Sequence, residues 1–277
     1  MLAVAALLCS LPATGLRVEN GIDYSRPELI SEVSRYVPGK SFLVGIHFTI
    51  KPGWHVYWRN PGDSGQEILV TWKLPPGWTA SGLMWPKPSV LTDTGLTMYV
   101  YGKEVTLLAR ITPAKSGTAR IAAHLDWLVC KDICLPAKKD LAITLPSASH
   151  PTANPRNALL LAKVAASLPA AKLVLQGQAV LGRKEITFEV ALPPKEVGKD
   201  MRFKFLPYDM GVVRNQPRAE ATCTQNLVAL RLPKSEYFNS GAKKLRGLLV
   251  WESEVETRRA ISFFHEIDLV LKPSLGK

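Results

Sequence analysis

Cys130 and Cys134, with three residues between them, are the side chains of this chain best suited to chemistry. The Cα atoms of a disulfide normally lie about 4.4–6.8 Å apart. Four residues of straight strand separate two Cα atoms by about 13 Å, and four residues of helix rise about 6 Å. A bond between these cysteines therefore requires a tight turn or a helical turn, and the intervening Lys131 and Asp132 suit a turn.

Such a bond would add little stability, because a disulfide that closes a short loop removes little entropy from the unfolded chain. This favours thiol-disulfide exchange, which needs a thiolate, an accessible sulfur and a resolving thiol. Lys131 would favour the thiolate, whereas Asp126, Asp132 and the apolar neighbours would oppose it. On spacing alone, a structural bridge between neighbouring strand ends remains an equal alternative.

The other two cysteines have no close partner in the sequence. Cys9 lies in an apolar N-terminal segment, and Cys223 lies in the strand-like run 219–224, where we expect a buried structural thiol. No cluster of cysteine and histidine completes a four-ligand metal site. We therefore expect no metal and no bound cofactor.

The N-terminal segment 1–15 resembles the apolar region and cleavage zone of a secretory signal peptide, although it lacks the basic start and is therefore partial. Lipidation at Cys9 and an apolar N-terminal strand are alternatives. No later stretch reaches the roughly 20 apolar residues of a membrane span. We expect an exported, soluble and monomeric chain in an oxidising compartment, where a disulfide is stable.

Composition and charge fit a globular protein rather than a nucleic-acid-binding one. The 277 residues are 47% hydrophobic and 21% charged, which is enough for one large or two ordinary domains. The net charge of +12 is scattered in short doublets, which indicates a solvated surface. Export also argues against a nucleic-acid partner.

Proline and glycine turns divide the first half of the chain into short strands, which predicts a β-sandwich over residues 17–146. A linker with a helix at 157–168 is predicted over 147–170, and a second β-sandwich over 171–277. The strands predicted most clearly are 41–50, 67–72, 105–111, 119–127, 140–145, 179–181, 185–190, 201–205, 227–232, 247–251 and 259–264.

Three motifs in the first half resemble a known family. They are Gly-Trp-His-Val-Tyr-Trp at 53–58, Gly-Leu-Thr-Met-Tyr-Val-Tyr-Gly at 95–102 and Leu-Asp-Trp-Leu-Val-Cys-Lys-Asp-Ile-Cys-Leu-Pro at 125–136. Together they resemble the periplasmic N-terminal domain of the DsbD family of thiol:disulfide interchange proteins. The longer run 53–65 is similar to the ScsB-like branch, whose members also carry a second β domain, here matched loosely over 150–272. The resemblance implies a mainly β fold of two immunoglobulin-like β-sandwich domains.

The resemblance also implies an activity without a cofactor. Members of the family relay electrons from a thioredoxin-like donor to periplasmic disulfide proteins, as thiol:disulfide oxidoreductases. By position, Cys130 and Cys134 match the redox pair, and Cys134 matches the cysteine that forms mixed disulfides with partners. The alternatives are a non-catalytic adaptor with a structural disulfide and a copper-tolerance thiol protein.

Further site residues follow from the same resemblance. His55 and Tyr57 would share one face of a strand beside the pair, although His55 fits an ordinary surface residue as well. We expect Asp126 and Trp127 of the third motif to support the site.

The resemblance implies a cap loop that shields the sulfurs until a partner displaces it. The cap loop is Tyr99, Val100, Tyr101 and Gly102. Because Val100 occupies the position where some relatives have phenylalanine, the capping aromatic is expected to be Tyr99 or Tyr101. The alternative is that both tyrosines pack in the core at a strand end.

Two departures from the family pattern concern electron delivery. The spacing of three residues within the pair is shorter than in the best-known members but is compatible with the ScsB-like branch. No transmembrane region and no thioredoxin-like domain follows Leu275. We therefore expect either a part of a larger membrane protein or a free-standing homologue whose membrane partner is separate.

Overall fold

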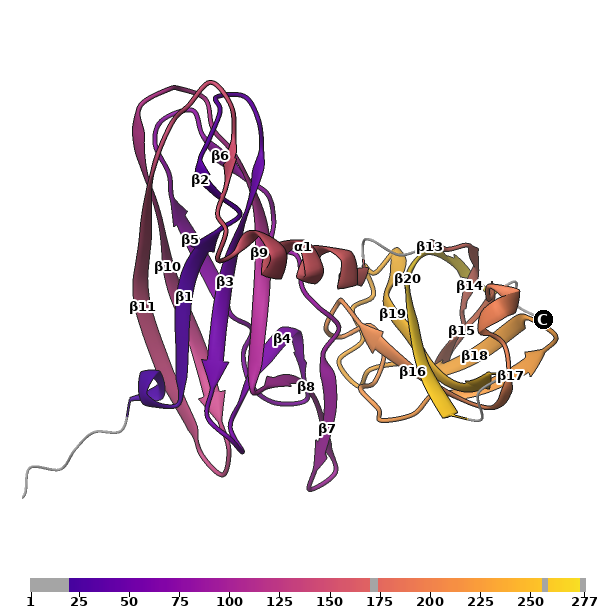
Figure 1. The fold of residues 1–277 in the computed structure, drawn as a ribbon. Helices are drawn as coiled ribbons and strands as arrows, with labels where there is room; N and C mark the ends of the chain where they lie inside the picture. The colour runs from indigo at the N-terminus through magenta and orange to yellow at the C-terminus, as the bar shows by residue number, and fades with distance from the viewer. Residues whose placement is uncertain (1–19, 170–173, 256–258, 275–277) are drawn as a thin grey trace, which may run out of the picture.

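The computed structural model describes residues 20–169, 174–255 and 259–274 of the chain. It contains two β-rich units that lie side by side and are bridged by the helix α1 (Ala158–Ser167) (Figure 1). The expected fold class, two immunoglobulin-like sandwiches joined by a linker with a short helix, is confirmed. The expected signal segment and Cys9 lie outside the described residues.

The first unit comprises η1 (Gly21–Asp23), β1 (Ser25–Ser31), β2 (Val33–Arg35), β3 (Phe42–Ile50), β4 (His55–Gly62), β5 (Leu69–Lys73), β6 (Thr79–Ala80), β7 (Ser89–Asp93), β8 (Leu96–Gly102), β9 (Glu104–Thr112), β10 (Thr118–Cys130), β11 (Cys134–Pro146) and β12 (Thr152–Ala153). One sheet has the order β1-β3-β9-β6, and the other has the order β11-β10-β4-β8-β7 with β5 beside β10. Strands β2 and β12 form a small separate ribbon.

The core of this unit lies between its two sheets. Large aromatic side chains from both sheets are fully buried there, because alternate residues of each strand point inward. The ring of Trp127 on β10 meets Phe48 on β3 edge-on at 5.4 Å, and its Nε1 donates to Ser25 Oγ at 2.7 Å. Rings of this size contribute a large part of the burial free energy of a core.

Helix α1 covers part of the outer face of the sheet that contains β3 and β9. Leu161 is fully buried against Leu43 and Leu108. A side chain at Gly45 of β3 would collide with Leu161, so the glycine permits the close approach of the helix. The helix ends before Pro169, as the sequence predicts.

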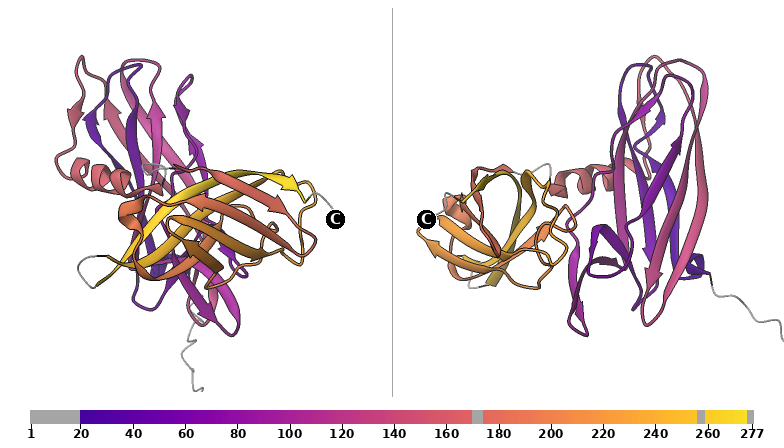
Figure 2. Two further views of the ribbon diagram at one scale, coloured as in Figure 1. Left: turned by 90° about the vertical axis from the view of Figure 1, so that its right-hand side faces the viewer. Right: turned by 180° about the vertical axis from the view of Figure 1, so that it is seen from behind.

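The second unit comprises β13 (Val174–Leu175), β14 (Gly177–Leu181), β15 (Glu185–Ala191), η3 (Pro194–Glu196), β16 (Lys199–Pro207), β17 (Glu220–Thr224), β18 (Leu227–Pro233), β19 (Lys244–Val255) and β20 (Arg259–Pro273). Its strands follow the order β16-β19-β20-β14-β15-β18-β17 around one apolar core. They run across the strands of the first unit at a steep angle (Figure 2).

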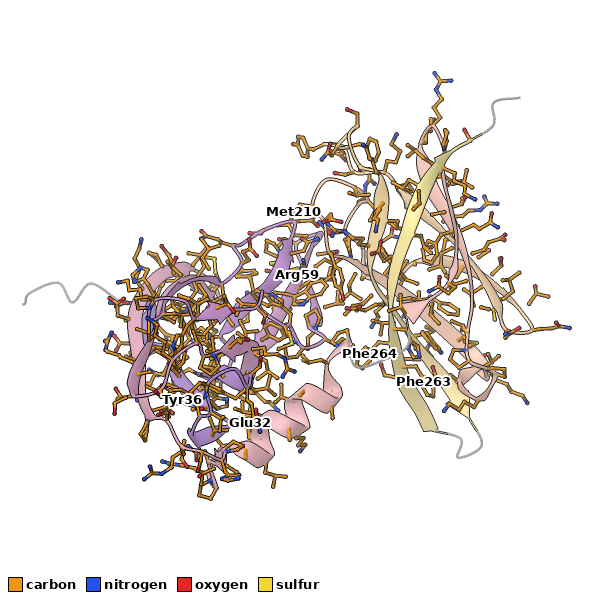
Figure 3. The ribbon with its side chains drawn as sticks, turned by 90° about the horizontal axis from the view of Figure 1, so that it is seen from above. Glu32, Tyr36, Arg59, Met210, Phe263 and Phe264 are labelled. Carbon is orange, nitrogen blue, oxygen red and sulfur yellow. A yellow bond between two sulfur atoms is a disulfide. The ribbon has the colours of Figure 1, made fainter. Side chains whose placement is uncertain are left out.

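The two units share an apolar boundary. Leu206, Leu248 and Val250 belong to the second unit but are buried in the core cluster of the first. Seen from above, Arg59 and Met210 lie at this boundary (Figure 3). Within the described part of the chain, no helix is long and apolar enough to cross a membrane.

Candidate functional site

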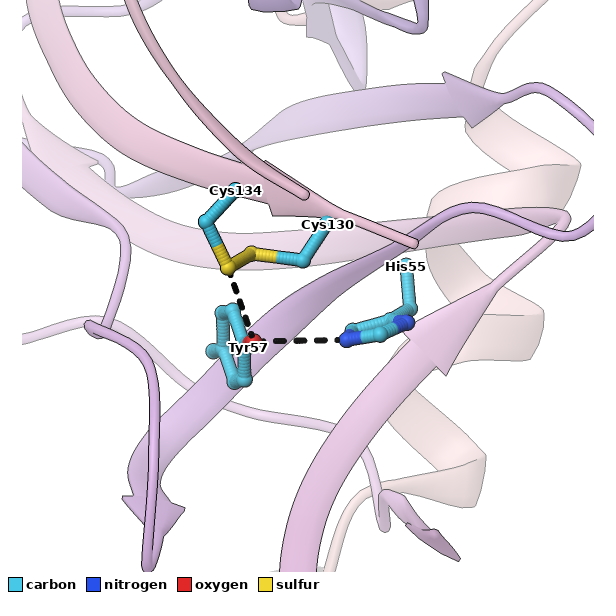
Figure 4. The surroundings of a disulfide bond; sticks show 4 residues. All are labelled: His55, Tyr57, Cys130 and Cys134. Atoms are coloured by element: carbon cyan, nitrogen blue, oxygen red, sulfur yellow. Dashed lines mark hydrogen bonds between the residues drawn. A yellow bond between two sulfur atoms is a disulfide. The ribbon is translucent and has the colours of Figure 1, made fainter. Parts of the chain in front are cut away.

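The two cysteines close the hairpin of β10 and β11. Cys130 is the last residue of β10 and lies directly opposite Cys134, the first residue of β11. Their sulfurs are bonded, and their Cα atoms are 4.2 Å apart (Figure 4). The turn 131–133 is tight, with the amide of Lys131 donating to the carbonyl of Ile133 at 3.1 Å. Of the two geometries that the spacing allowed, the chain adopts the tight turn.

The two sulfur-bearing residues differ in exposure. Cys130 is 2% exposed and packs in a small apolar cluster with Tyr57, Met98 and Val100, whereas Cys134 is exposed. A nucleophile from solvent or from a partner protein therefore reaches Cys134 and not Cys130. This asymmetry defines which sulfur can be attacked first.

Strand β4 brings a histidine to the same row as the cysteines. Cys130 pairs with His55 on β4, and His55 pairs with Gly102 on β8. Paired residues of neighbouring strands point to the same face of a sheet, so Cys134, Cys130 and His55 share one face. Gly102 adds no side chain beyond the histidine, so β8 leaves that position of the face uncovered.

Tyr57 connects the histidine to the exposed cysteine. Its hydroxyl lies 3.8 Å from Cys134 Sγ and 3.3 Å from His55 Nε2 (Figure 4). The two rings meet edge-on at 5.2 Å. A disulfide sulfur can only accept, so in the Nε2–H tautomer His55 donates to Tyr57 and Tyr57 donates to Cys134 Sγ. His55 and Tyr57 thus come together with the pair, as the shared strand face predicted.

Burial sets the protonation of both side chains. It lowers the pKa of the His55 imidazole and raises the pKa of the Tyr57 hydroxyl. At neutral pH the imidazole is therefore neutral and the phenol keeps its proton. The hydroxyl remains able to donate a hydrogen bond to a sulfur that gains negative charge.

The expected cap requires a correction. Residues 99–102 belong to strand β8 rather than to a loop over the sulfurs. Alternation along this strand places Val100 in the apolar cluster with Cys130, and it turns Tyr99 and Tyr101 into the core between the sheets. Neither tyrosine therefore caps the disulfide, and the core alternative holds for both.

The core contacts of these tyrosines explain their position. The ring of Tyr99 meets Trp58 edge-on at 5.8 Å, and the hydroxyl of Tyr101 donates to the carbonyl of Pro86 at 2.6 Å. A buried tyrosine needs such a partner for its ring or its hydroxyl. Tyr57 of β4 and Val100 of β8 pack with Cys130 in the apolar cluster instead.

Two further residues of the third motif lie away from the sulfurs. Trp127 is a core residue, and Asp126 forms an ion pair with Lys138 of the neighbouring strand, at 2.7 Å. Both precede the cysteines on the long strand β10. The expected support of these two residues for the site therefore stays a prediction.

Cys223 also differs from expectation. It is an exposed free thiol, not a buried one, and it lies on β17, the edge strand of the sheet in the second unit. An edge strand packs against a neighbour along one side only, which leaves this side chain facing solvent. Among the described residues, no group of three or more histidine, cysteine, aspartate or glutamate side chains is placed to bind a metal.

The segment between Asn60 and Gly65 lies beside the site, although none of its residues was expected to be a site residue. Gly65 has a φ of +98°, and a Cβ atom there would lie within the ring of Tyr57. The glycine therefore lies directly against the tyrosine whose hydroxyl reaches Cys134. The sequence pattern that could have indicated this contact is the pair of glycines, Gly62 and Gly65, in the run 53–65.

The first unit is thus a β-sandwich with a disulfide at the end of a hairpin, in which one cysteine is buried and the other is exposed. Residues 26–146 match the family described as thiol:disulfide interchange protein DsbD, N-terminal. The resemblance seen in the three motifs is thereby confirmed.

One solved structure is similar to this chain over both units. The N-terminal periplasmic domain of ScsB from Proteus mirabilis is similar over 90% of this chain and 94% of its own, with a TM-score of 0.65 at 14% identity. This likeness shows a shared fold. The reduced N-terminal domain of DsbD from Neisseria meningitidis aligns over 49% of this chain and 96% of its own, with a TM-score of 0.33 at 16% identity. No sequence among curated proteins matches the chain.

Proposed function

We propose that this protein is a periplasmic electron relay that exchanges its Cys130–Cys134 disulfide with thioredoxin-like proteins. The observation that carries the proposal is the pairing of an exposed residue, Cys134, with a buried Cys130, with the hydroxyl of Tyr57 3.8 Å from Cys134 Sγ. The match of residues 26–146 to the family described as thiol:disulfide interchange protein DsbD, N-terminal, supports the same class of reaction.

In the first step, a thiolate of the donor attacks Cys134 Sγ. The bond between Cys134 and Cys130 breaks, its electron pair leaves with Cys130 as a thiolate, and a mixed disulfide forms on Cys134. The second thiol of the donor then attacks the donor sulfur of this mixed disulfide and releases Cys134 as a thiolate. The donor dithiol has become a disulfide, and two electrons now reside on the pair.

Tyr57 acts on the sulfur that changes charge. Its O–H donates toward Cys134 Sγ, and a hydrogen bond to an ionised acceptor is stronger than one to a neutral acceptor. The thiolate is thus stabilised more than the disulfide, which lowers the barrier to its release. Neutral His55 donates to the phenol oxygen from the other side and keeps the hydroxyl aimed at the sulfur.

The second half of the relay runs in the opposite direction. The thiolate of Cys134 attacks the disulfide of an acceptor, and Cys130 then attacks Cys134 Sγ, which re-forms the intramolecular disulfide and releases the acceptor as a dithiol. A protein partner fits the surroundings of the sulfur, because Ile133 in the adjacent turn is 54% exposed. The donor would draw its electrons from a membrane partner.

The alternative is a structural disulfide in a non-catalytic adaptor, which the position of the pair at a hairpin end favours. The reduction potential separates the two functions. A structural disulfide lies below about −300 mV, and an exchanging one is more oxidising. Equilibration with a thioredoxin-like dithiol should place this pair above that value. A pair that remains oxidised at lower potentials would favour the adaptor.

A further inference from the structure

Strand β4 carries the site on one side and the boundary with the second unit on the other. Tyr57 faces the sulfurs, whereas the following residue, Trp58, lies 5.5 Å from the ring of Tyr208. The guanidinium of Arg59 lies 4.4 Å above the same ring. The hydroxyl of Tyr208 donates to Glu266 Oε1 at 2.6 Å, which fixes the ring within the second unit. Figure 3 shows Arg59 at this boundary.

The next residue of β4 bonds directly to the second unit. Asn60 is fully buried, and its Nδ2 donates to the carbonyl of Pro207 at 2.8 Å. Its Oδ1 accepts from the amide of Gly62 at 3.0 Å. A buried amide that has lost water is costly unless both ends are bonded, so Asn60 ties the course of the chain after β4 to the second unit.

Asp63 makes a second connection across the boundary. Its Oδ2 accepts from the amide of Thr97 on β8 at 2.7 Å, and its Oδ1 accepts from Nδ2 of Asn215 at 2.9 Å. Two residues later, Gly65 lies against the ring of Tyr57. Residues 60–65, which we call the clasp, therefore connect the second unit to the tyrosine beside Cys134.

We propose that the second unit positions Tyr57 at Cys134 through the clasp, with Asn215 as a positioning residue. This rests on the proposed function, because it assigns the second unit a part in the same exchange site. Asn215 touches neither sulfur. Its bond to Asp63 limits the movement of the clasp and hence of the ring against Gly65.

The thiol pKa of Cys134 reports the position of Tyr57 without any partner protein. A hydroxyl that donates to the thiolate lowers this pKa, and a displaced hydroxyl lets it rise. The measurement uses the full chain with Cys130→Ser, and with Cys223→Ser to remove the other free thiol. The rate of alkylation as a function of pH then gives the pKa of Cys134 alone.

A pair of substitutions tests the bond between Asp63 and Asn215. Asn215→Asp places two carboxylates against each other and should raise the thiol pKa by about half a unit or more. Asp63→Asn should have little effect, because Oδ1 of Asn215 is buried without a hydrogen-bond partner among the described residues and can accept from the new amide. The double variant restores an amide facing a carboxylate and should return the pKa to its starting value.

Repeating the substitutions in a Tyr57→Phe variant separates an effect that acts through the Tyr57 hydroxyl from other effects on the thiol pKa of Cys134. There, Asn215→Asp should no longer shift the pKa, whereas a direct effect of the new charge, or a general loosening, would persist. If Asn215→Asp does not fold, Asn215→Ala replaces it in the test. Asn215→Ala should also raise the thiol pKa of Cys134, by a smaller amount. Arg214→Ala is the matched control, because Arg214 pairs with Glu236 inside the second unit.

Three results would overturn the inference: an unchanged pKa in Asn215→Asp, a shift that persists in the Tyr57→Phe background, or a double variant that does not recover. Exchange with a thioredoxin-like protein is measured separately. If that exchange is absent while the pKa pattern holds, the proposed function fails and the coupling between the units stands.

Discussion

The hydroxyl of Tyr57 lies 3.8 Å from Sγ of Cys134, on the exposed half of the disulfide. The buried half, Cys130, has apolar neighbours instead. The protein thus offers hydrogen-bond stabilisation to the one sulfur that an attacking thiolate can reach.

Tyr57→Phe should raise the thiol pKa of Cys134 and slow exchange by roughly tenfold, because a hydrogen bond to a charged group contributes about 1.5–3 kcal/mol. Alkylation of the Cys130→Ser variant as a function of pH gives the pKa, and stopped-flow reduction by a dithiol gives the rate. Tyr101→Phe removes a hydroxyl that bonds to Pro86 in the core and should change neither quantity. Equal effects from both substitutions would contradict a specific role for Tyr57.

Cys130→Ser should trap a mixed disulfide with a thioredoxin-like partner, because the attacked sulfur remains and the resolving thiol is gone. Cys134→Ser should form no such complex, since Cys130 is only 2% exposed. Non-reducing electrophoresis and mass spectrometry of the linked peptides identify the bond. Trapping through Cys130 would reverse the order of attack, and wild-type exchange by both variants would exclude a relay.

Gly65→Ala should lower both the free energy of unfolding and the rate of exchange. The new methyl group would enter the ring of Tyr57, and a φ of +98° is unfavourable for alanine, with strain of about 1–3 kcal/mol. Gly95→Ala is the matched control, because its φ is +85° and nothing lies within 4 Å of the new atom. Urea unfolding should show a lower free energy of unfolding for both variants, and the decrease should be larger for Gly65→Ala. Only Gly65→Ala should slow reduction of the disulfide, and a similar slowing in the control would remove the link to Tyr57.

His55 should make stability depend on pH. Burial lowers its pKa in the folded protein below the usual 6.5, so the unfolded chain binds a proton first as the pH falls. The free energy of unfolding should therefore decrease as the pH drops below about 6.5 and stop decreasing below the folded pKa. His55→Gln should flatten this part of the profile in urea unfolding at a series of pH values. An unchanged slope in the variant would mean that other groups cause the dependence.

Much of the fold followed from the sequence because its signals are local. Alternating patterns and turn residues predicted most of the long strands and the helix before Pro169. The predicted strands 119–127 and 140–145 proved to be longer, since the turn lies only at 131–133 and the cysteines themselves end the two strands. The partnership of His55 and Tyr57 followed from the alternation of side chains along a strand.

The rest depends on contacts that leave no periodic signal. Alternation placed Tyr99 and Tyr101 on one face and Val100 on the other, but the sequence did not say which face holds the sulfurs. Asn60 and Pro207 are 147 residues apart, and a single buried amide between two units has no pattern to reveal it. The exposure of Cys223 follows from the edge position of β17, which depends on the order of strands in the sheet.

The burial of Cys130 has a kinetic consequence. In the proposed relay, donor and acceptor would use the same surface around Cys134, because Cys130 is only 2% exposed. Each turnover must alternate between a disulfide form that reacts with the donor and a dithiol form that reacts with the acceptor. Steady-state rates should then follow a ping-pong scheme, with parallel lines in double-reciprocal plots. An excess of reduced donor should inhibit by occupying the dithiol form, and an excess of oxidised acceptor should inhibit by occupying the disulfide form.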